Sequence, residues 1–129
     1  MDIIGKTLKK EIIVTKELLA SSMKSGALPV FATPAMIAYM EETALELASK
    51  FLEENISTVG TKVNIEHLAP TPPGMKVTCT ATITGFDGRK FCFDVICEDE
   101  AEIIGRGTHE RFTVVNDKFM AKVNSKIKG

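Results

Sequence analysis

The sequence predicts an α+β fold in which one long helix is wrapped by an antiparallel sheet. Two observations lead to this prediction. Residues 33–51 have helical periodicity with an unusually wide apolar face. Further along, several segments have strand character, and residues 75–84 alternate strictly between apolar and polar side chains. A sheet that is apolar on one face needs an apolar partner, and the helix supplies it.

The helical segment reads TPAMIAYMEETALELASKF. We expect Thr33 to act as its N-cap and Pro34 to take the first helical position, where the missing N–H costs nothing. No glycine or proline interrupts the segment, and we expect the helix to end near Asn55. Its polar residues project onto one narrow arc: Glu42, Glu46, Ser49, Lys50 and Glu53. The helix should therefore be buried on most of its sides.

Glu41 breaks this pattern because it falls inside the apolar arc. A carboxylate that faces a core is costly unless it is paired, and burial raises its pKa. Two interpretations stay open. Glu41 is a functional carboxylate, or it lies at the edge of the arc and reaches water or pairs with a buried cation.

Shorter elements precede the helix. Residues 8–14 predict a strand, and their lysines favour a place at a sheet edge. Thr15 is a candidate cap for a short helix over residues 16–23, and a loop over residues 25–29 follows.

Residues 57–68 alternate as a strand. The predicted inner face consists of Val59, Thr61, Val63, Ile65 and His67. Gly60 then falls on the outer face, where a glycine marks either a bulge or the close approach of a ligand to the backbone. An isolated inward histidine is more often structural than catalytic. If the helix covers this face, however, His67 could meet Glu41, and that pairing favours catalysis.

Three more strands are predicted, so that residues 57–116 form a four-stranded antiparallel meander. These strands are residues 75–84, 90–98 and 101–116. Asp87-Gly88 marks a tight hairpin between the first two of them. A short basic helix is expected over residues 119–127.

In the last predicted strand, Gly105, Gly107, His109 and Arg111 share one face. Small residues beside a histidine and a cation suit the approach of an anionic or carbonyl group. A solvated strand with ordinary charges is the alternative, and spacing alone favours it.

Composition excludes several classes of protein. The 129 residues carry a net charge of −1 and no block of Lys and Arg, so nucleic-acid binding is not expected. No apolar run is long enough to span a membrane, and the N-terminus does not resemble a signal peptide, so we expect a cytoplasmic protein. Cys79, Cys92 and Cys97 lack a CxxC pair and are expected to be reduced core thiols. Neither a metal site nor a cofactor is predicted.

Four segments together resemble the hot-dog-fold thioesterases, and within them the fluoroacetyl-CoA thioesterase-like family. They are FATPAMIAYMEETA, VGTKVNIEHLAPTPPG, the strand pair joined by DGRKF, and IGRGTHER. The resemblance extends from about residue 5 to residue 128. It implies a single hot-dog thioesterase-like domain over residues 1–129. It also implies a homodimer, or a tetramer of such dimers, with acyl-CoA entering active sites at the dimer interface.

The same resemblance implies a catalytic set of Thr33, Glu41 and His67. It implies substrate contacts at Gly60 and Arg111. Glu41 would attack the thioester directly or deprotonate water, and His67 would polarise the carbonyl or transfer the proton. Thr33 would act as a nucleophile, orient its neighbours or only cap the helix.

The expected reaction is hydrolysis of a short- or medium-chain acyl-CoA to the acid and CoA. The resemblance implies that selectivity for fluoroacetyl-CoA depends on an aromatic-rich lid before the main helix. Here that region has only Phe31 as an aromatic residue, so fluoroacetyl-CoA itself is not the expected substrate. Two other functions stay open: a dehydratase or hydratase on the same fold, and a non-catalytic module that binds acyl-CoA.

Overall fold

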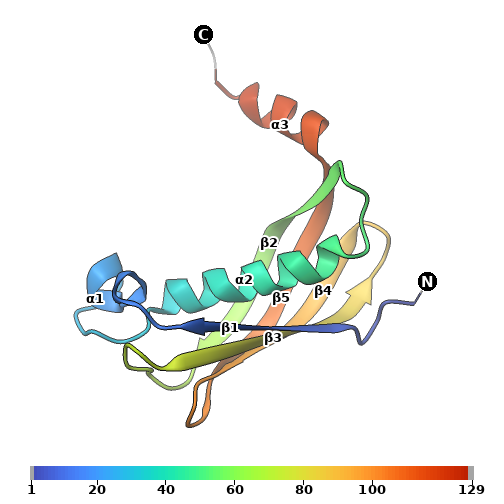
Figure 1. The fold of residues 1–129 in the computed structure, drawn as a ribbon. Helices are drawn as coiled ribbons and strands as arrows, with labels where there is room; N and C mark the ends of the chain where they lie inside the picture. The colour runs from blue at the N-terminus through green and yellow to red at the C-terminus, as the bar shows by residue number, and fades with distance from the viewer. Residues whose placement is uncertain (1, 128–129) are drawn as a thin grey trace.

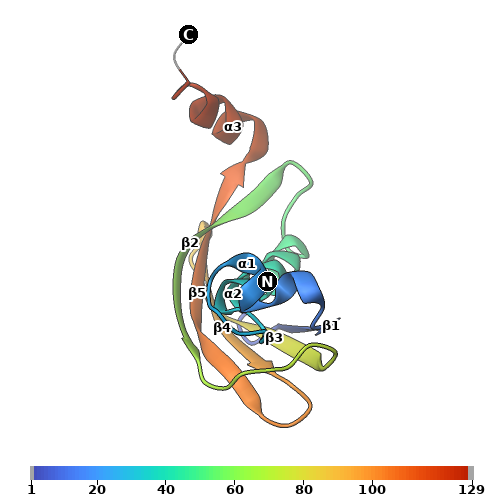
Figure 2. The same ribbon diagram turned by 90° about the vertical axis from the view of Figure 1, so that its left-hand side faces the viewer.

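The structure is a computed structural model that describes residues 2–127. It has the predicted α+β arrangement, with one antiparallel sheet and one long helix, α2 (Thr33–Ser49). The strands are β1 (Thr7–Ile13), β2 (Ile56–His67), β3 (Lys76–Phe86), β4 (Lys90–Glu98) and β5 (Ile103–Val115). Figure 1 shows α2 lying along one face of the sheet, and Figure 2 shows the sheet curving around that helix.

The order of strands in the sheet is β1-β3-β4-β5-β2. The predicted meander is correct for β3, β4 and β5 but wrong for β2, which pairs with β5. The loop between β2 and β3 contains three prolines, which lack the N–H groups that a tight hairpin ladder needs. This loop carries the chain to the other side of the sheet, where β3 pairs with β1. Both β1 and β2 are therefore edge strands.

The prediction of one continuous short helix over residues 16–23 is wrong, because this segment forms two separate helical turns. A 3-10 turn, η1 (Lys16–Leu18), and a single helical turn, α1 (Ala20–Met23), flank the extended residue Leu19. Leu19 is buried and forms an isolated bridge with Phe31, so its backbone cannot continue the helix.

The predicted polar arc of α2 is confirmed, since Glu42, Glu46 and Ser49 are all exposed. The opposite side of the helix packs on the sheet through Met36, Met40, Ala44, Leu47 and Ala48. The helix ends at Ser49 rather than near Asn55, because the chain tightens into turns closed by Lys50 and Phe51. On the exposed side, the ammonium of Lys10 on β1 lies 3.2 Å from Glu42 and 2.9 Å from Glu46.

The helix predicted after β5 is present as α3 (Asn116–Asn124), which buries none of its residues and projects beyond the sheet (Figure 1). All three cysteines are free thiols, as expected, and Cys79 and Cys97 face each other in the core across β3 and β4. Over residues 2–127, no helix is long and apolar enough to cross a membrane, and no cluster of three or more His, Cys, Asp or Glu residues could hold a metal ion.

Gly107→Ala tests the tight pairing of β2 with β5. An added Cβ would collide with the backbone of Asn64, which cannot move without breaking the ladder. We expect a loss of roughly 1–3 kcal/mol or more in the free energy of unfolding, measured by chemical denaturation. Gly85→Ala is the matched control, because its Cβ would lie an ordinary 3.6 Å from Cys92. Equal stability of the two variants would contradict this packing.

Candidate active site

A β-bulge in β2 corrects the predicted faces of that strand. The pairing with β5 shifts between Gly60 and Lys62, so Thr61 is an extra residue. Val63, Ile65 and His67 keep the predicted inward direction, but Thr58 and Gly60 replace Val59 and Thr61 on the inner face before the bulge. Strict alternation could not reveal this reversal.

Arg111 is the centre of one group of site residues on this face. Its guanidinium is nearly fully buried and is fixed by Thr58, since Nε donates to the hydroxyl at 2.8 Å and Nη2 donates to the carbonyl at 2.9 Å. Burial lowers the pKa of Arg111, and the Glu41 carboxylate partly offsets this effect. Arginine nevertheless remains charged at neutral pH. The site thus contains a fixed, poorly solvated positive charge.

His109 holds the other side of that guanidinium. Its Nδ1 lies 2.8 Å from the carbonyl oxygen of Lys62, so Nδ1 carries the proton and donates it. Nε2 then has a free lone pair and accepts from Arg111 Nη1 at 3.1 Å. Burial lowers the pKa of His109, and the Arg111 charge lowers it further despite the Lys62 carbonyl, so the ring is neutral. It also stacks on Phe93 at 6.0 Å.

Glu41 lies at the edge of the buried face of α2, and 42% of its side chain is exposed. Its Oε2 is 3.9 Å from Arg111 Nη1. A Cβ added to Gly60 would lie 2.8 Å from the same carboxylate oxygen, so the missing side chain of Gly60 makes room for Glu41. Glu41 thus lies beside a buried cation and is less buried than its place in the apolar arc suggested, and this pairing leaves a functional role open.

Thr33 and His67 form a second group, at the other end of β2. The sequence predicted Thr33 as the N-cap of α2, and this prediction is wrong. Ala32 takes the N-cap position, without a side-chain hydrogen bond, and Thr33 is the first residue of the helix. Its Oγ1 lies 2.7 Å from His67 Nδ1 instead. Burial lowers the pKa of His67, partly offset by the backbone of Ala69. Among the described residues, His67 Nε2 is buried and has no hydrogen-bond partner.

A cavity of about 290 Å³ adjoins this second group. Thr33 and His67 line it together with small or aliphatic residues from the segment before α2 and from the loop after β2, namely Ala20, Ser25, Val30, Ala69 and Pro70. Phe31, the one aromatic residue of the segment, also lines it.

The two groups are far apart within one chain. Gly60, beside Glu41, and His67 are separated by seven positions of β2, which corresponds to roughly 20 Å of extended strand. Thr33 and Glu41 are two turns apart on α2, or roughly 12 Å. The contact between Glu41 and His67 that the sequence suggested is thus not made within the chain.

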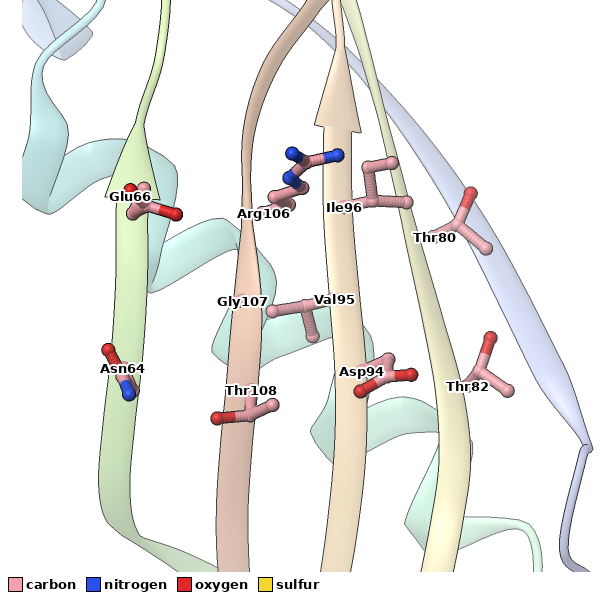
Figure 3. Close-up of a pocket in the computed structure, with 10 residues that line it drawn as sticks. All are labelled: Asn64, Glu66, Thr80, Thr82, Asp94, Val95, Ile96, Arg106, Gly107 and Thr108. Carbon is pink, nitrogen blue, oxygen red and sulfur yellow. The ribbon is translucent and has the colours of Figure 1, made fainter.

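A larger cavity, of about 530 Å³, lies on the opposite face of the sheet. Figure 3 shows its polar side chains on the face away from α2, in two rows across the strands that include Glu66 and Arg106 in one row and Asn64 and Asp94 in the other. Val95, which lies between the rows, belongs to the core. The cavity contains none of the predicted site residues, and its charges are of both signs.

Comparison with known proteins identifies the family of the chain. The family model of FlK, the fluoroacetyl-CoA-specific thioesterase, matches residues 14–117. The chain belongs to this family. It is 39% identical over 97 residues to the fluoroacetyl-CoA thioesterase of Streptantibioticus cattleyicolor, a match that covers 75% of this chain and 70% of that protein.

Solved structures place the fold among the hot-dog proteins. A structure of FlK superposes with a TM-score of 0.91 at 31% identity and covers 97% of both chains. A thioesterase superfamily member from Thermus thermophilus superposes with a TM-score of 0.87 at 29% identity, covering 95% of this chain and 90% of that one. A hot-dog-like protein from Thermanaerovibrio acidaminovorans, at 22% identity, shares the fold with a TM-score of 0.88 over 98% and 93% of the two chains.

Two contributors to the site were missed in the sequence. His109 was noted only for sharing a face with Arg111, and Thr58 was not noted at all. The signal for His109 was present, because a histidine two residues before an arginine on an inward strand face lies beside it. The signal for Thr58 was absent, because only the bulge turns it inward.

His109→Phe tests whether His109 positions Arg111. The phenyl ring keeps the stack on Phe93 but removes both nitrogens, which leaves the Lys62 carbonyl without this donor and Arg111 Nη1 with only its 3.9 Å contact to Glu41. We expect the family's thioesterase turnover, kcat, to fall roughly ten- to a hundredfold with little change in KM. His109→Gln, whose amide can accept from Arg111, should recover part of the loss. Native kcat in the folded His109→Phe variant would exclude this role.

Proposed function

We propose that this protein hydrolyses a short- or medium-chain acyl-CoA thioester to the acid and CoA, with Thr33, Glu41 and His67 as the catalytic set. Membership of a thioesterase family supports the reaction class. The observation that carries the assignment of residues is the 2.7 Å contact between Thr33 and His67 at the mouth of a cavity, with His67 Nε2 left free. A cavity of about 290 Å³ suits a short acyl group better than a long one.

The chemistry requires a base or nucleophile, a proton donor and a stabilised oxyanion. If Thr33 donates its hydroxyl proton to Nδ1, His67 carries its own proton on the free Nε2. Glu41, held near Arg111, would deprotonate water as it attacks the carbonyl, or attack directly to give an anhydride. Collapse of the tetrahedral intermediate expels the CoA thiolate, which His67 Nε2–H would protonate. In the second route, water would then hydrolyse the anhydride to release the acid and restore Glu41.

We also propose that the protein is a homodimer whose two β2 edges pair. β2 is twelve residues long, no strand of residues 2–127 pairs with its outer side, and Val63 on it is 44% exposed. Such an edge invites pairing with another strand. An antiparallel two-fold pairing centred between Val63 and Asn64 brings Gly60 of one subunit alongside His67 of the partner subunit. Each active site would then combine Thr33 and His67 of one chain with Glu41 of the other.

Glu41→Gln is the first test of the activity. The amide keeps the shape of the carboxylate but can neither take a proton nor attack, so kcat should fall by about 10²–10⁴-fold. Thiol release is measured with acetyl-, fluoroacetyl-, butyryl-, octanoyl- and benzoyl-CoA. Glu42→Gln is the matched control, one residue along the same helix but exposed, and should retain native turnover. Unchanged turnover in Glu41→Gln would overturn the assignment of Glu41.

Mixing two inactive variants tests the shared site. A heterodimer of Glu41→Gln and His67→Asn subunits contains one site with both changes and one site with neither. After unfolding and refolding together, the mixture should recover about one quarter of native activity. Sites contained within single chains would give no recovery, because every chain carries one change.

A further inference from the structure

A third hollow, of about 400 Å³, lies where α3 leaves the end of β5. Arg89 from the β3–β4 hairpin and Lys118 and Lys122 from α3 line it, and no acidic residue does. Among the ion pairs of residues 2–127, none involves these three side chains. The net charge of the chain is −1, so positive charge is concentrated locally around this hollow. Such a local concentration of positive charge suits an anionic ligand.

The floor of this hollow is apolar. Ile56 on β2, Val114 on β5 and Phe119 on α3 line it, and Phe119 is half-buried. An aromatic ring within an apolar floor provides a surface on which a nucleobase can stack. The hollow therefore combines what a phosphorylated nucleotide requires, namely cations for the phosphates and an apolar platform for the base.

The hollow is also close to the reacting groups. Thr113 lines it and lies two residues from Arg111 on β5, directly opposite Thr58, which fixes the Arg111 guanidinium. The strand from Arg111 to Val115 spans roughly 13 Å. A ligand bound in the hollow can therefore extend a flexible arm along the end of β5 toward Glu41.

We propose that this basic hollow binds the phosphate-bearing nucleotide end of the CoA substrate. The proposal rests on the proposed acyl-CoA thioesterase function. In it, Arg89, Lys118 and Lys122 bind the phosphate groups of CoA. It also gives α3 a function, since this helix buries no residue in the core and contributes two of the three cations. The larger cavity on the outer face of the sheet suits a polyanion poorly, because Glu66 and Asp94 accompany Arg106 there (Figure 3).

The test is the double charge reversal Lys118→Glu with Lys122→Glu. Both residues are exposed, so the fold should be retained. We expect KM for acetyl-CoA to rise at least roughly tenfold with kcat unchanged. Hydrolysis of the N-acetylcysteamine thioester, which lacks phosphates and nucleotide, should be unaffected. Lys6→Glu with Lys9→Glu is the matched control, because it makes the same change in net charge at the opposite edge of the sheet and should leave both reactions native.

Direct binding separates this proposal from the proposed function. Calorimetric titration of CoA into the native protein and the double variant should show affinity falling at least roughly tenfold in the variant, and falling less steeply with added salt. That result supports the nucleotide site even if the native protein hydrolyses no thioester. Native CoA affinity in the double variant, or an equal loss in the Lys6/Lys9 control, would overturn the site and leave the hydrolase assignment standing.

Discussion

The buried guanidinium of Arg111 is the constraint on which the rest of the site depends. A charge at this depth needs hydrogen-bond partners, and Thr58 and His109 accept three hydrogen bonds from the guanidinium from two strands. Thr58 faces the guanidinium only because β2 has a bulge at Thr61. Gly60 faces inward for the same reason, and its lack of a side chain leaves room for the Glu41 carboxylate. The bulge, the glycine and the position of Glu41 thus form one arrangement around one charge.

This arrangement gives the chain half of a site at each end of β2. Arg111 holds a carboxylate at one end, and a histidine with an unpartnered nitrogen lies beside a cavity at the other. The two groups are roughly 20 Å apart along β2 and roughly 12 Å apart along α2, so they do not meet within a single chain. The proposed pairing of β2 edges removes this separation and gives the long exposed edge a partner. Under that proposal, assembly and catalysis are inseparable, and a monomer would be folded but inactive.

The sequence predicted the helices and strands better than it predicted which strands pair with one another. Periodicity identified α2 and its exposed arc, and strict alternation identified β3, because both patterns are local. The partner of β2 could not be read in this way, because a proline-rich loop permits either side of the sheet. Glu41 and His67 stood out as polar residues within apolar patterns, and both lie at the site. Thr58 stayed hidden because one inserted residue reverses the faces of a strand, and alternation assumes that no residue is inserted.

Net charge is a poor guide to the ligands of such a protein. At −1 the chain has no overall attraction for a polyanion, and the absence of a basic block predicts no nucleic-acid surface of the usual kind. CoA, however, presents only a few phosphates at one end of a long arm, so a local concentration of cations is enough to recognise it. Arg89 is about thirty residues before Lys118 and Lys122 in the sequence, and only the meander of β3, β4 and β5 brings the hairpin next to α3. Under the proposed CoA site, cations that are scattered in the sequence form one binding surface through topology, which composition does not record.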